Sequence, residues 1–498
     1  MSSLHRNPQK AAAQSYDLII VGGGVQGVML TLMATLRGLK PLLLERRDFG
    51  GNTSFNSLRI IHGGFRYLQK MNLSRLMQSA AERRWFLQTF PQLIKPLPCM
   101  VPLYGDGLRR PSTLYAALKI YNLITRNRNQ GLCEKNQIPA GHLVSPKKVQ
   151  ELFPLVNMRG LQGGAIWYDA FVEDSQRLLI EVLKIACNRG AEVLNYCEAT
   201  ELLTNENQVA GLRATDVETG ECLEFRSARV VNAAGPWCRE LASTFDRDYP
   251  ELFRSMLAWN VLFDRESLST HGVAVKSDRT AHTYFLVPWK GRLMAGTGHA
   301  PWQYESKTPV PKGQQIDEFI KDINYAVTGL NLKDEEIMYV LPGLQSATET
   351  GGTNLETNAV IIDHGLRGGA QGFFSVSGVK FTTSRFVAEK LLQQVFQPSQ
   401  GGPGLLGPQE CLSDGWNYMH EEVPTGDELQ QKLRSIVRDE AVVHIEDLLY
   451  RRTTLWENPA RVNHIAPLIC QFLEYESDKI DEEVSLVNNL VTHRMTIL

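Results

Sequence analysis

Three glycines near the start of the chain have the spacing of a phosphate-binding turn. Gly22, Gly24 and Gly27 follow an apolar run and precede a stretch with apolar residues at helical spacing. Such a turn lets backbone N–H groups approach a pyrophosphate, and the N-terminus of the next helix attracts its negative charge. Glu45, 18 residues beyond Gly27, has the place of the acidic residue that accepts hydrogen bonds from a ribose. These residues predict a dinucleotide site.

Two later segments favour a flavin dinucleotide over a nicotinamide one. Residues 377–383 form a glycine- and threonine-rich turn between a predicted strand and a predicted helix. The N-terminus of that helix would stabilise negative charge on the pyrimidine edge of a reduced flavin. Residues 232–237 end another strand and let the backbone pass close to a cofactor. We expect non-covalent FAD, because no cysteine lies near residues 377–383; a histidine linkage stays open.

The elements that must position these residues follow from hydrophobic periodicity. A strand over 16–21, a helix over 25–37 and a strand over 40–44 form one βαβ unit of the usual length. Residues 91–110 are proline-rich and are expected to be a loop. The remaining predicted elements are helices over 72–90, 175–188 and 382–396, and strands over 191–196, 259–263, 282–288, 292–297 and 373–376, with a β-meander over 199–231.

Composition excludes several classes of protein. The 498 residues carry 52 Lys and Arg against 54 Asp and Glu, which argues against an overall nucleic-acid-binding surface. The eight cysteines contain no C-x-x-C pair. The most apolar segment, 18–30, is interrupted by four glycines and is too short to span a bilayer of ~30 Å. We expect a cytoplasmic protein, with peripheral contact at the inner face of a membrane left open.

Four segments together carry a family resemblance. They are 52–68 (NTSFNSLRIIHGGFRYL), 232–237 (NAAGPW), 378–385 (GVKFTTSR) and 446–453 (EDLLYRRT). In type and order they resemble the FAD-dependent glycerol-3-phosphate dehydrogenases, within the D-amino-acid-oxidase-like flavoproteins. The resemblance extends over nearly the whole chain from residue 16.

The resemblance implies an α/β fold: a Rossmann-like FAD-binding domain, an antiparallel-sheet substrate domain and a helical C-terminal cap. We expect a flexible leader over 1–15. The FAD-binding domain would lie within 16–397 as 16–90, 150–237 and 355–397. The substrate domain would be interleaved with it as 91–149 and 238–354, and a helical domain would occupy 408–498 after a glycine-rich linker.

The resemblance also implies which residues touch the cofactor and the substrate. Arg66 and Lys380 would face an anionic substrate beside the flavin, and Ala199 would lie near the adenine. The other residues expected to line FAD are Thr53, Ser54, Ser57, Ile60, His62, Ala234, Gly235, Gly378, Lys380, Phe381 and Thr382.

Three positions depart from the family pattern. Ala258-Trp259-Asn260 replaces a Gly-Ser-His, and Gly296-Thr297-Gly298-His299 replaces a Gly-Thr-Thr-Asp. Residues 342–346 lack an arginine expected to hold phosphate. The resemblance therefore supports the family's flavin better than it supports the family's substrate, unless Arg292 or His299 replaces the missing phosphate ligand.

The expected reaction is hydride transfer from an alcohol carbon of a small anionic substrate to the flavin. A histidine, His62 or His299, would accept the hydroxyl proton, although flavin packing for His62 and a solvated loop for His299 are simpler interpretations. The electron acceptor would be a quinone, oxygen or another carrier. The alternatives are an amine or amino-acid oxidase of the same superfamily and a flavin-binding module without turnover.

Overall fold

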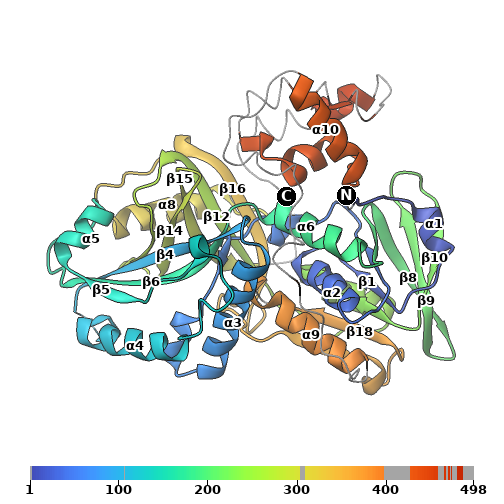
Figure 1. The fold of residues 1–498 in the computed structure, drawn as a ribbon, viewed down its shortest axis with the longest axis horizontal. Helices are drawn as coiled ribbons and strands as arrows, with labels where there is room; N and C mark the ends of the chain where they lie inside the picture. Colours follow the sequence, from blue (N-terminus) through green and yellow to red (C-terminus); the bar gives the residue numbers. More distant parts are fainter. Residues whose placement is uncertain are drawn as a thin grey trace.

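The computed structural model describes residues 3–105, 107–302, 309–378, 380–396, 406, 427–457, 465–466, 469–470, 473 and 479–485. The expected linker, 397–407, lies outside these residues except for Leu406, and so does much of the expected C-terminal domain. Within them the chain forms two lobes side by side, with C-terminal helical segments resting on one of their edges (Figure 1).

The smaller lobe is built on a six-stranded sheet whose first strands are short and wholly apolar. β1 (Leu18–Val21) and β2 (Pro41–Leu44) are buried along their whole length, as strands of a parallel sheet covered on both faces must be. The order is β17-β18-β11-β1-β2-β7, and only β17 runs antiparallel to its neighbour. The other strands are β7 (Glu192–Leu194), β11 (Val230–Asn232), β17 (Val360–Asp363) and β18 (Phe373–Ser377).

Helices and a meander cover this sheet. The helices α2, α6 and α9 form one apolar core with β1 and β2, and a meander of β8, β9 and β10 forms a second core on the other face of these strands. Their bounds are α2 (Val25–Thr35), α6 (Ser175–Cys187), α7 (Cys238–Phe245), α9 (Ser384–Val395), β8 (Cys197–Asn205), β9 (Gln208–Asp216) and β10 (Cys222–Arg226).

The larger lobe contains a nine-stranded sheet with the order β16-β12-β15-β14-β13-β4-β6-β3, and β5 pairs with β6. Its strands are β3 (Ile60–Ile61), β4 (Ile94–Leu103), β5 (His142–Val144), β6 (Gly163–Val172), β12 (Ser255–Glu266), β13 (Gly272–Lys276), β14 (Thr283–Trp289), β15 (Arg292–Pro301) and β16 (Ile337–Ser346). Its helices are α3 (Leu73–Thr89), α4 (Pro111–Ile124), α5 (Pro146–Leu152) and α8 (Gly313–Ala326). The two lobes with a helical C-terminal region confirm the expected fold class.

The expectation of a loop over 91–110 is wrong for its central part, because β4 pairs with β6 along its whole length. Pro96, Pro98 and Pro102 cannot donate backbone hydrogen bonds, so they fit only where a strand has an edge without a partner. On its other side β4 meets β13 at Cys99 and Met100 alone. The prolines therefore occupy the parts of that edge that need no donor.

Two segments differ from the expected domain plan. The expected flexible leader contains α1 (Pro8–Ala12), and Leu4 within it is buried and donates its N–H to the Asp439 carbonyl. Arg6 pairs with Asp216 at 2.8 Å. β3 and β6, which were expected in the FAD-binding domain, belong to the large sheet of the other lobe.

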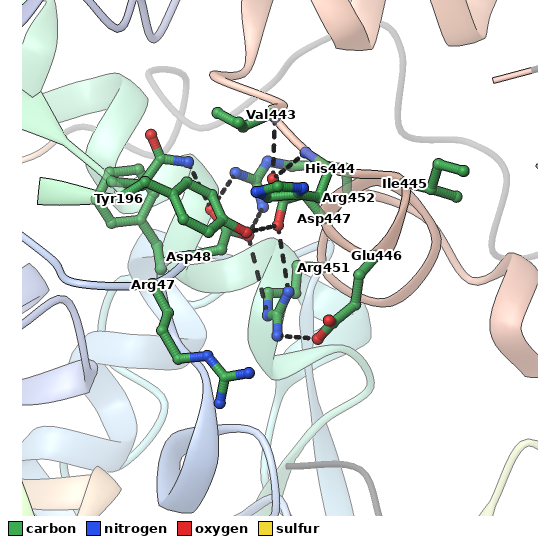
Figure 2. A network of polar contacts seen from close by, with 12 residues as sticks. Arg47, Asp48, Tyr196, Val443, His444, Ile445, Glu446, Asp447, Arg451 and Arg452 are labelled. Atoms are coloured by element: carbon green, nitrogen blue, oxygen red, sulfur yellow. Dashed lines mark hydrogen bonds and ion pairs between the residues drawn. The ribbon is translucent and has the colours of Figure 1, made fainter. Parts of the chain in front are cut away.

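A buried ion pair joins the C-terminal segment to the turn after β2. Arg452 donates to both carboxylate oxygens of Asp48, at 2.6 and 2.8 Å, and both side chains are fully buried (Figure 2). Burial opposes ionisation of Asp48, but the charge and hydrogen bonds of Arg452 outweigh it and lower the pKa of Asp48. Asn195 donates to the same carboxylate at 2.9 Å. The helical turn Asp447–Arg452, which follows α10 (Asp427–Asp439), is thereby anchored to the smaller lobe.

Changing Arg452→Met should lower the free energy of unfolding by about 3–5 kcal/mol, because it leaves the Asp48 carboxylate buried without its partner. The double variant Asp48→Leu/Arg452→Met should recover most of that loss. Urea denaturation of each variant measures the effect. The exposed Arg438→Met is the matched control and should cost at most ~1 kcal/mol. An equal loss for Arg438→Met and Arg452→Met would contradict a special contribution from the buried pair.

Candidate active site

One cavity of about 1520 Å³ runs between the two lobes and is lined by segments far apart in the sequence. Its volume exceeds the roughly 300–1,000 Å³ of a site for one drug-sized molecule. Of the residues predicted to serve the site, the following line it: Gly22, Gly24, Glu45, Thr53, Ser54, Ser57, Ile60, His62, Arg66, Ala199, Ala234, Gly235, His299, Gly378, Lys380, Phe381 and Thr382.

Gly27 does not line the cavity; it shapes the turn that does. A Cβ on Gly27 would collide with the Gly22 carbonyl oxygen, so α2 can approach β1 this closely only with glycine there. Gly22 has a φ of 113°, and a Cβ on it would lie 2.7 Å from the Ala233 carbonyl oxygen. This contact brings Gly22 and the turn that follows β11 to the same end of the cavity.

Glu45 directly follows β2 and lies beside this turn. Its carboxylate accepts from the Gly23 N–H at 2.6 Å and from the Arg47 N–H at 2.9 Å. Burial raises the pKa of Glu45, and these two backbone donors partly offset that effect. The carboxylate is therefore fixed in orientation at the nucleotide end of the cavity, where a carboxylate can accept hydrogen bonds from ribose hydroxyls.

The segment 52–62 runs along the cavity wall. The Ser54 hydroxyl accepts from the Val25 N–H at 3.0 Å, so this segment also caps the start of α2. At the other end of the segment, the His62 N–H donates to the Thr382 hydroxyl at 3.1 Å. This bond joins the segment to the distant turn that holds Lys380. The structure therefore brings together, at one cavity, two segments that were expected from the sequence to line the FAD.

Two cations, Lys380 in that turn and Arg66 just after segment 52–62, line the cavity. Lys380 hydrogen-bonds the Tyr67 hydroxyl, and its ammonium lies 4.7 Å from the centre of the Tyr67 ring. Arg66 belongs to the same short helix, Phe65–Lys70, and is exposed where it lines the cavity. Tyr67 was not identified from the sequence, although it lies inside the segment that carried the resemblance.

His62 lies against a buried carboxylate that the sequence did not reveal. His62 Nδ1 is 3.5 Å from Asp169 Oδ2. Asp169 also accepts from the Gly63 N–H at 2.6 Å and from the Trp167 indole N–H at 3.2 Å. Burial opposes ionisation of Asp169, but its hydrogen bond to His62 and nearby positive charge lower its pKa. No short motif marks Asp169, because it meets His62 through the pairing of β6 with β3.

The departures from the family pattern lie on three neighbouring strands of the large sheet, β12, β15 and β16. Asn260 donates to the Asn56 carbonyl at 2.9 Å and accepts from the Thr297 hydroxyl at 3.1 Å, so it holds segment 52–62 in place. Arg292 does not line the cavity; it lies 3.4 Å from Asp264 at the start of β15. The suggestion that Arg292 compensates for a missing phosphate ligand is therefore wrong. His299 does line the cavity.

The residues present fit FAD on structural grounds. A glycine turn and a helix N-terminus suited to a pyrophosphate lie at one end of the cavity, beside an oriented carboxylate. The helix α9 begins directly after the turn at the other end, where it can stabilise an electron-rich ring edge. Gly22, Gly24, Glu45, Ala199 and Ala234 would hold the nucleotide half, and segment 52–62 with residues 378–382 the flavin half.

Comparisons with known proteins agree with this geometry. The sequence model of the FAD dependent oxidoreductase (DAO) family matches residues 17–393. A glycerol-3-phosphate dehydrogenase from Synechocystis sp. is 28% identical over 412 residues, covering 78% of this chain and 72% of that protein. An aerobic glycerol-3-phosphate dehydrogenase from Staphylococcus haemolyticus is 28% identical over 397 residues, covering 79% and 69%.

Solved structures show the same fold. The glycerol-3-phosphate dehydrogenase from Bacillus halodurans, complexed with FAD, superposes with a TM-score of 0.73 at 18% identity, covering 98% of this chain and 96% of that one. The L-α-glycerophosphate oxidase from Mycoplasma pneumoniae, with FAD bound, gives 0.55 at 15% identity, covering 78% and 98%. Among the described residues, no helix is both long and apolar enough to cross a bilayer. The chain belongs to the FAD dependent oxidoreductase (DAO) family, and its cofactor is FAD.

Proposed function

We propose that this oxidoreductase oxidises an alcohol carbon of a small anionic substrate, as the glycerol-3-phosphate dehydrogenases similar to it do by name. The observation that carries the proposal is that Arg66, Lys380 and His62 line the one cavity, with His62 paired to the buried Asp169. An anion-binding pair of cations beside an oriented imidazole suits an alcohol that bears a negative group. The cofactor supplies the two-electron acceptor.

Arg66 and Lys380 hold the anionic group of the substrate. Lys380 is kept in place by the Tyr67 hydroxyl, so little side-chain freedom is lost when an anion binds. Each charge-assisted hydrogen bond is worth about 1.5–3 kcal/mol. Two such contacts fix the reacting carbon relative to the cofactor, a positioning effect that lowers the barrier by several kcal/mol.

His62 accepts the hydroxyl proton, and Asp169 orients it. With Nδ1 directed at the Asp169 carboxylate, the imidazole carries its proton there and leaves the Nε2 lone pair for the substrate hydroxyl. His299, the other histidine considered as a base, is less suited. Burial and the nearby His282 lower the pKa of His299 to about 4, which makes its imidazole a weak base.

Peripheral contact with a membrane is the second part of the proposal. The outward face of α4 exposes Tyr115, Ile120 and Leu123, with exposed fractions of 53, 47 and 68%. Arg110 precedes the helix and Lys119 lies on the same face, both exposed. An apolar helix face with adjacent cations is typical of helices that lie at a lipid surface. Such a contact on the outer side of the larger lobe would suit an acceptor dissolved in lipid, a quinone (Figure 1).

Reduction of the flavin under anaerobic conditions tests the proposed reaction. Glycerol 3-phosphate, short hydroxy acids and amino acids are added anaerobically to the purified holoprotein, and bleaching of the flavin absorbance is followed. A hydroxylated anion should bleach it, and Lys380→Ala should weaken that substrate's binding about ten- to a hundredfold through the lost charge-assisted bond. Lys390→Ala, exposed on α9, is the control.

Bleaching by amino acids alone would replace the proposal with an amino-acid oxidase. Bleaching by none of these compounds would instead favour a flavin-binding module without turnover. An unchanged affinity in Lys380→Ala would remove that residue from the anion site.

A second prediction separates positioning from binding. Asp169→Asn keeps the shape of the side chain but removes the charge that orients His62. The limiting rate of anaerobic flavin reduction should fall at least about tenfold, within the range that general base catalysis supplies, while the substrate concentration giving half of that rate stays the same. Asp278→Asn, which is largely exposed, should change neither quantity. A normal limiting rate in Asp169→Asn would rule out the proposed pair.

A third prediction concerns α4. The holoprotein should sediment with vesicles of phosphatidylcholine and phosphatidylglycerol, and Ile120→Ser/Leu123→Ser should weaken this at least about tenfold because apolar surface is lost. Val217→Ser, a half-exposed apolar residue on the smaller lobe, is the control. Equal sedimentation of all three proteins, or none with the wild type, would contradict a contact through α4.

A further inference from the structure

A short C-terminal segment, residues 447–456, bridges the two lobes beside the cavity, and we call it the strap. Its contacts with the smaller lobe are polar. Arg452 binds the Asp48 carboxylate, and Asp447 accepts a hydrogen bond from the Tyr196 hydroxyl (Figure 2). These contacts hold one end of the strap on the turn after β2 and on the turn between β7 and β8.

The other end of the strap is held on the larger lobe by Trp456, which is buried. The centre of its ring lies 5.5 Å from that of Trp289 on β14 and 5.0 Å from that of Tyr339 on β16. The Tyr339 hydroxyl also donates to the Trp456 carbonyl at 2.9 Å. Phe55, in the cavity-wall segment 52–62, packs on the same ring, with 5.6 Å between ring centres. The strap is therefore anchored on both lobes.

The strap also reaches the cavity itself, because Arg451 lines it together with Asp48. Arg451 is buried and is held by Glu446 and by Asp447, the latter at 3.3 Å. The turn that carries Arg451 is a π-helix, a form found frequently at functional sites. A fixed cation on this side of the cavity suits a cofactor whose pyrophosphate is negatively charged.

The turn held by the strap in turn holds the glycine turn. The Gly50 N–H donates to the Gly23 carbonyl at 2.9 Å, and the Gly23 N–H donates to the Glu45 carboxylate at 2.6 Å. Asp48, the residue that Arg452 binds, lies between these two attachment points. Release of the strap would therefore loosen the residues expected to hold the pyrophosphate and the ribose.

We propose that the strap is part of the cofactor site and retains FAD, so that the cofactor leaves only after the strap detaches from one lobe. While both of its ends are bound, the lobes cannot separate beside the nucleotide end of the cavity. The strap follows residue 393, where the match to the family ends, so this contribution comes from outside the shared domain. The inference concerns retention of the cofactor and does not depend on the substrate.

The test follows the exchange of bound FAD for 8-chloro-FAD, which is added in excess to the holoprotein, by the change in absorbance. Trp456→Ala removes the anchor on the larger lobe and should speed the exchange at least about tenfold, because a buried tryptophan contributes much packing energy. Phe153→Ala, a buried aromatic residue of the larger lobe that does not line the cavity, is the control and should leave the exchange rate unchanged.

A milder variant keeps every ring in place. Tyr339→Phe removes only the hydrogen bond to the Trp456 carbonyl, and it should speed the exchange about twofold to tenfold, in line with loss of one neutral hydrogen bond. Tyr16→Phe is the matched control, since the buried Tyr16 also donates its hydroxyl to a backbone carbonyl, that of Ala11, at 2.9 Å. It should exchange FAD at the rate of the wild type.

Coupling between FAD and the strap must be reciprocal. Amide hydrogen exchange in residues 447–456 should therefore be slower in the holoprotein than in the full chain after FAD has been removed. α5, which does not line the cavity, is the internal reference and should exchange equally in both forms.

An unchanged rate of FAD exchange in both Trp456→Ala and Tyr339→Phe would overturn the inference. Equal acceleration in the two control variants would overturn it too, because general destabilisation would then explain the effect. Equal protection of the strap with and without FAD would contradict the coupling. Strap-dependent FAD exchange in a protein whose flavin no substrate reduces would leave the inference intact and refute the proposed oxidation instead.

Discussion

The close approach of Gly27 to the Gly22 carbonyl is the contact on which the rest of the site depends. It sets how near α2 starts to β1, and therefore where the free N–H groups of the helix point. The turn after β11 meets the same backbone at Ala233, and segment 52–62 caps α2 through Ser54. At its other end this segment enters the large sheet as β3, and the hydrogen bond of His62 to Thr382 joins it back to the smaller lobe at the Lys380 turn. Widening the glycine turn would therefore displace the turn after β11, segment 52–62 and the turn that contains Thr382.

The turn after β2 connects this cradle to the C-terminal segment. Glu45 at its start and Asp48 at its end both line the cavity, and Asp48 is also paired with the buried Arg452. Tyr196, in the turn between β7 and β8, donates its hydroxyl to the Asp447 carboxylate at 2.6 Å (Figure 2). The turn after β2 and the turn after β7 are therefore both held by one C-terminal helical turn. The carboxylate that would bind ribose is thus supported by residues about 400 positions away in the chain, and the family resemblance in segment 446–453 acquires a structural reason.

Local signals made the fold and much of the candidate site predictable, and long-range contacts account for the rest. The glycine turn, Glu45 and the Lys380 turn depend on residues close in sequence, and the structure gathers them around one cavity. Asp169 could not be found, because its contact with His62 exists only through strand pairing. The prolines of β4 indicated a loop, since the sequence does not show that one edge of that strand lacks a partner. Arg292 was considered for an anion site that it does not reach, and Asn260, noted only as a missing histidine, anchors segment 52–62.

The flavin content of Gly27→Ala tests the central claim most directly, namely that FAD lies in the cavity shaped by this turn. The variant and the wild type are purified in parallel, and FAD bound per chain is measured from absorbance after titration with free FAD. Gly313→Ala, where a Cβ meets nothing within 4 Å, is the matched control. The account predicts one FAD per chain for the wild type and the control, and little or none for Gly27→Ala. Full loading of a folded Gly27→Ala protein, or a wild type that takes up no FAD, would contradict it.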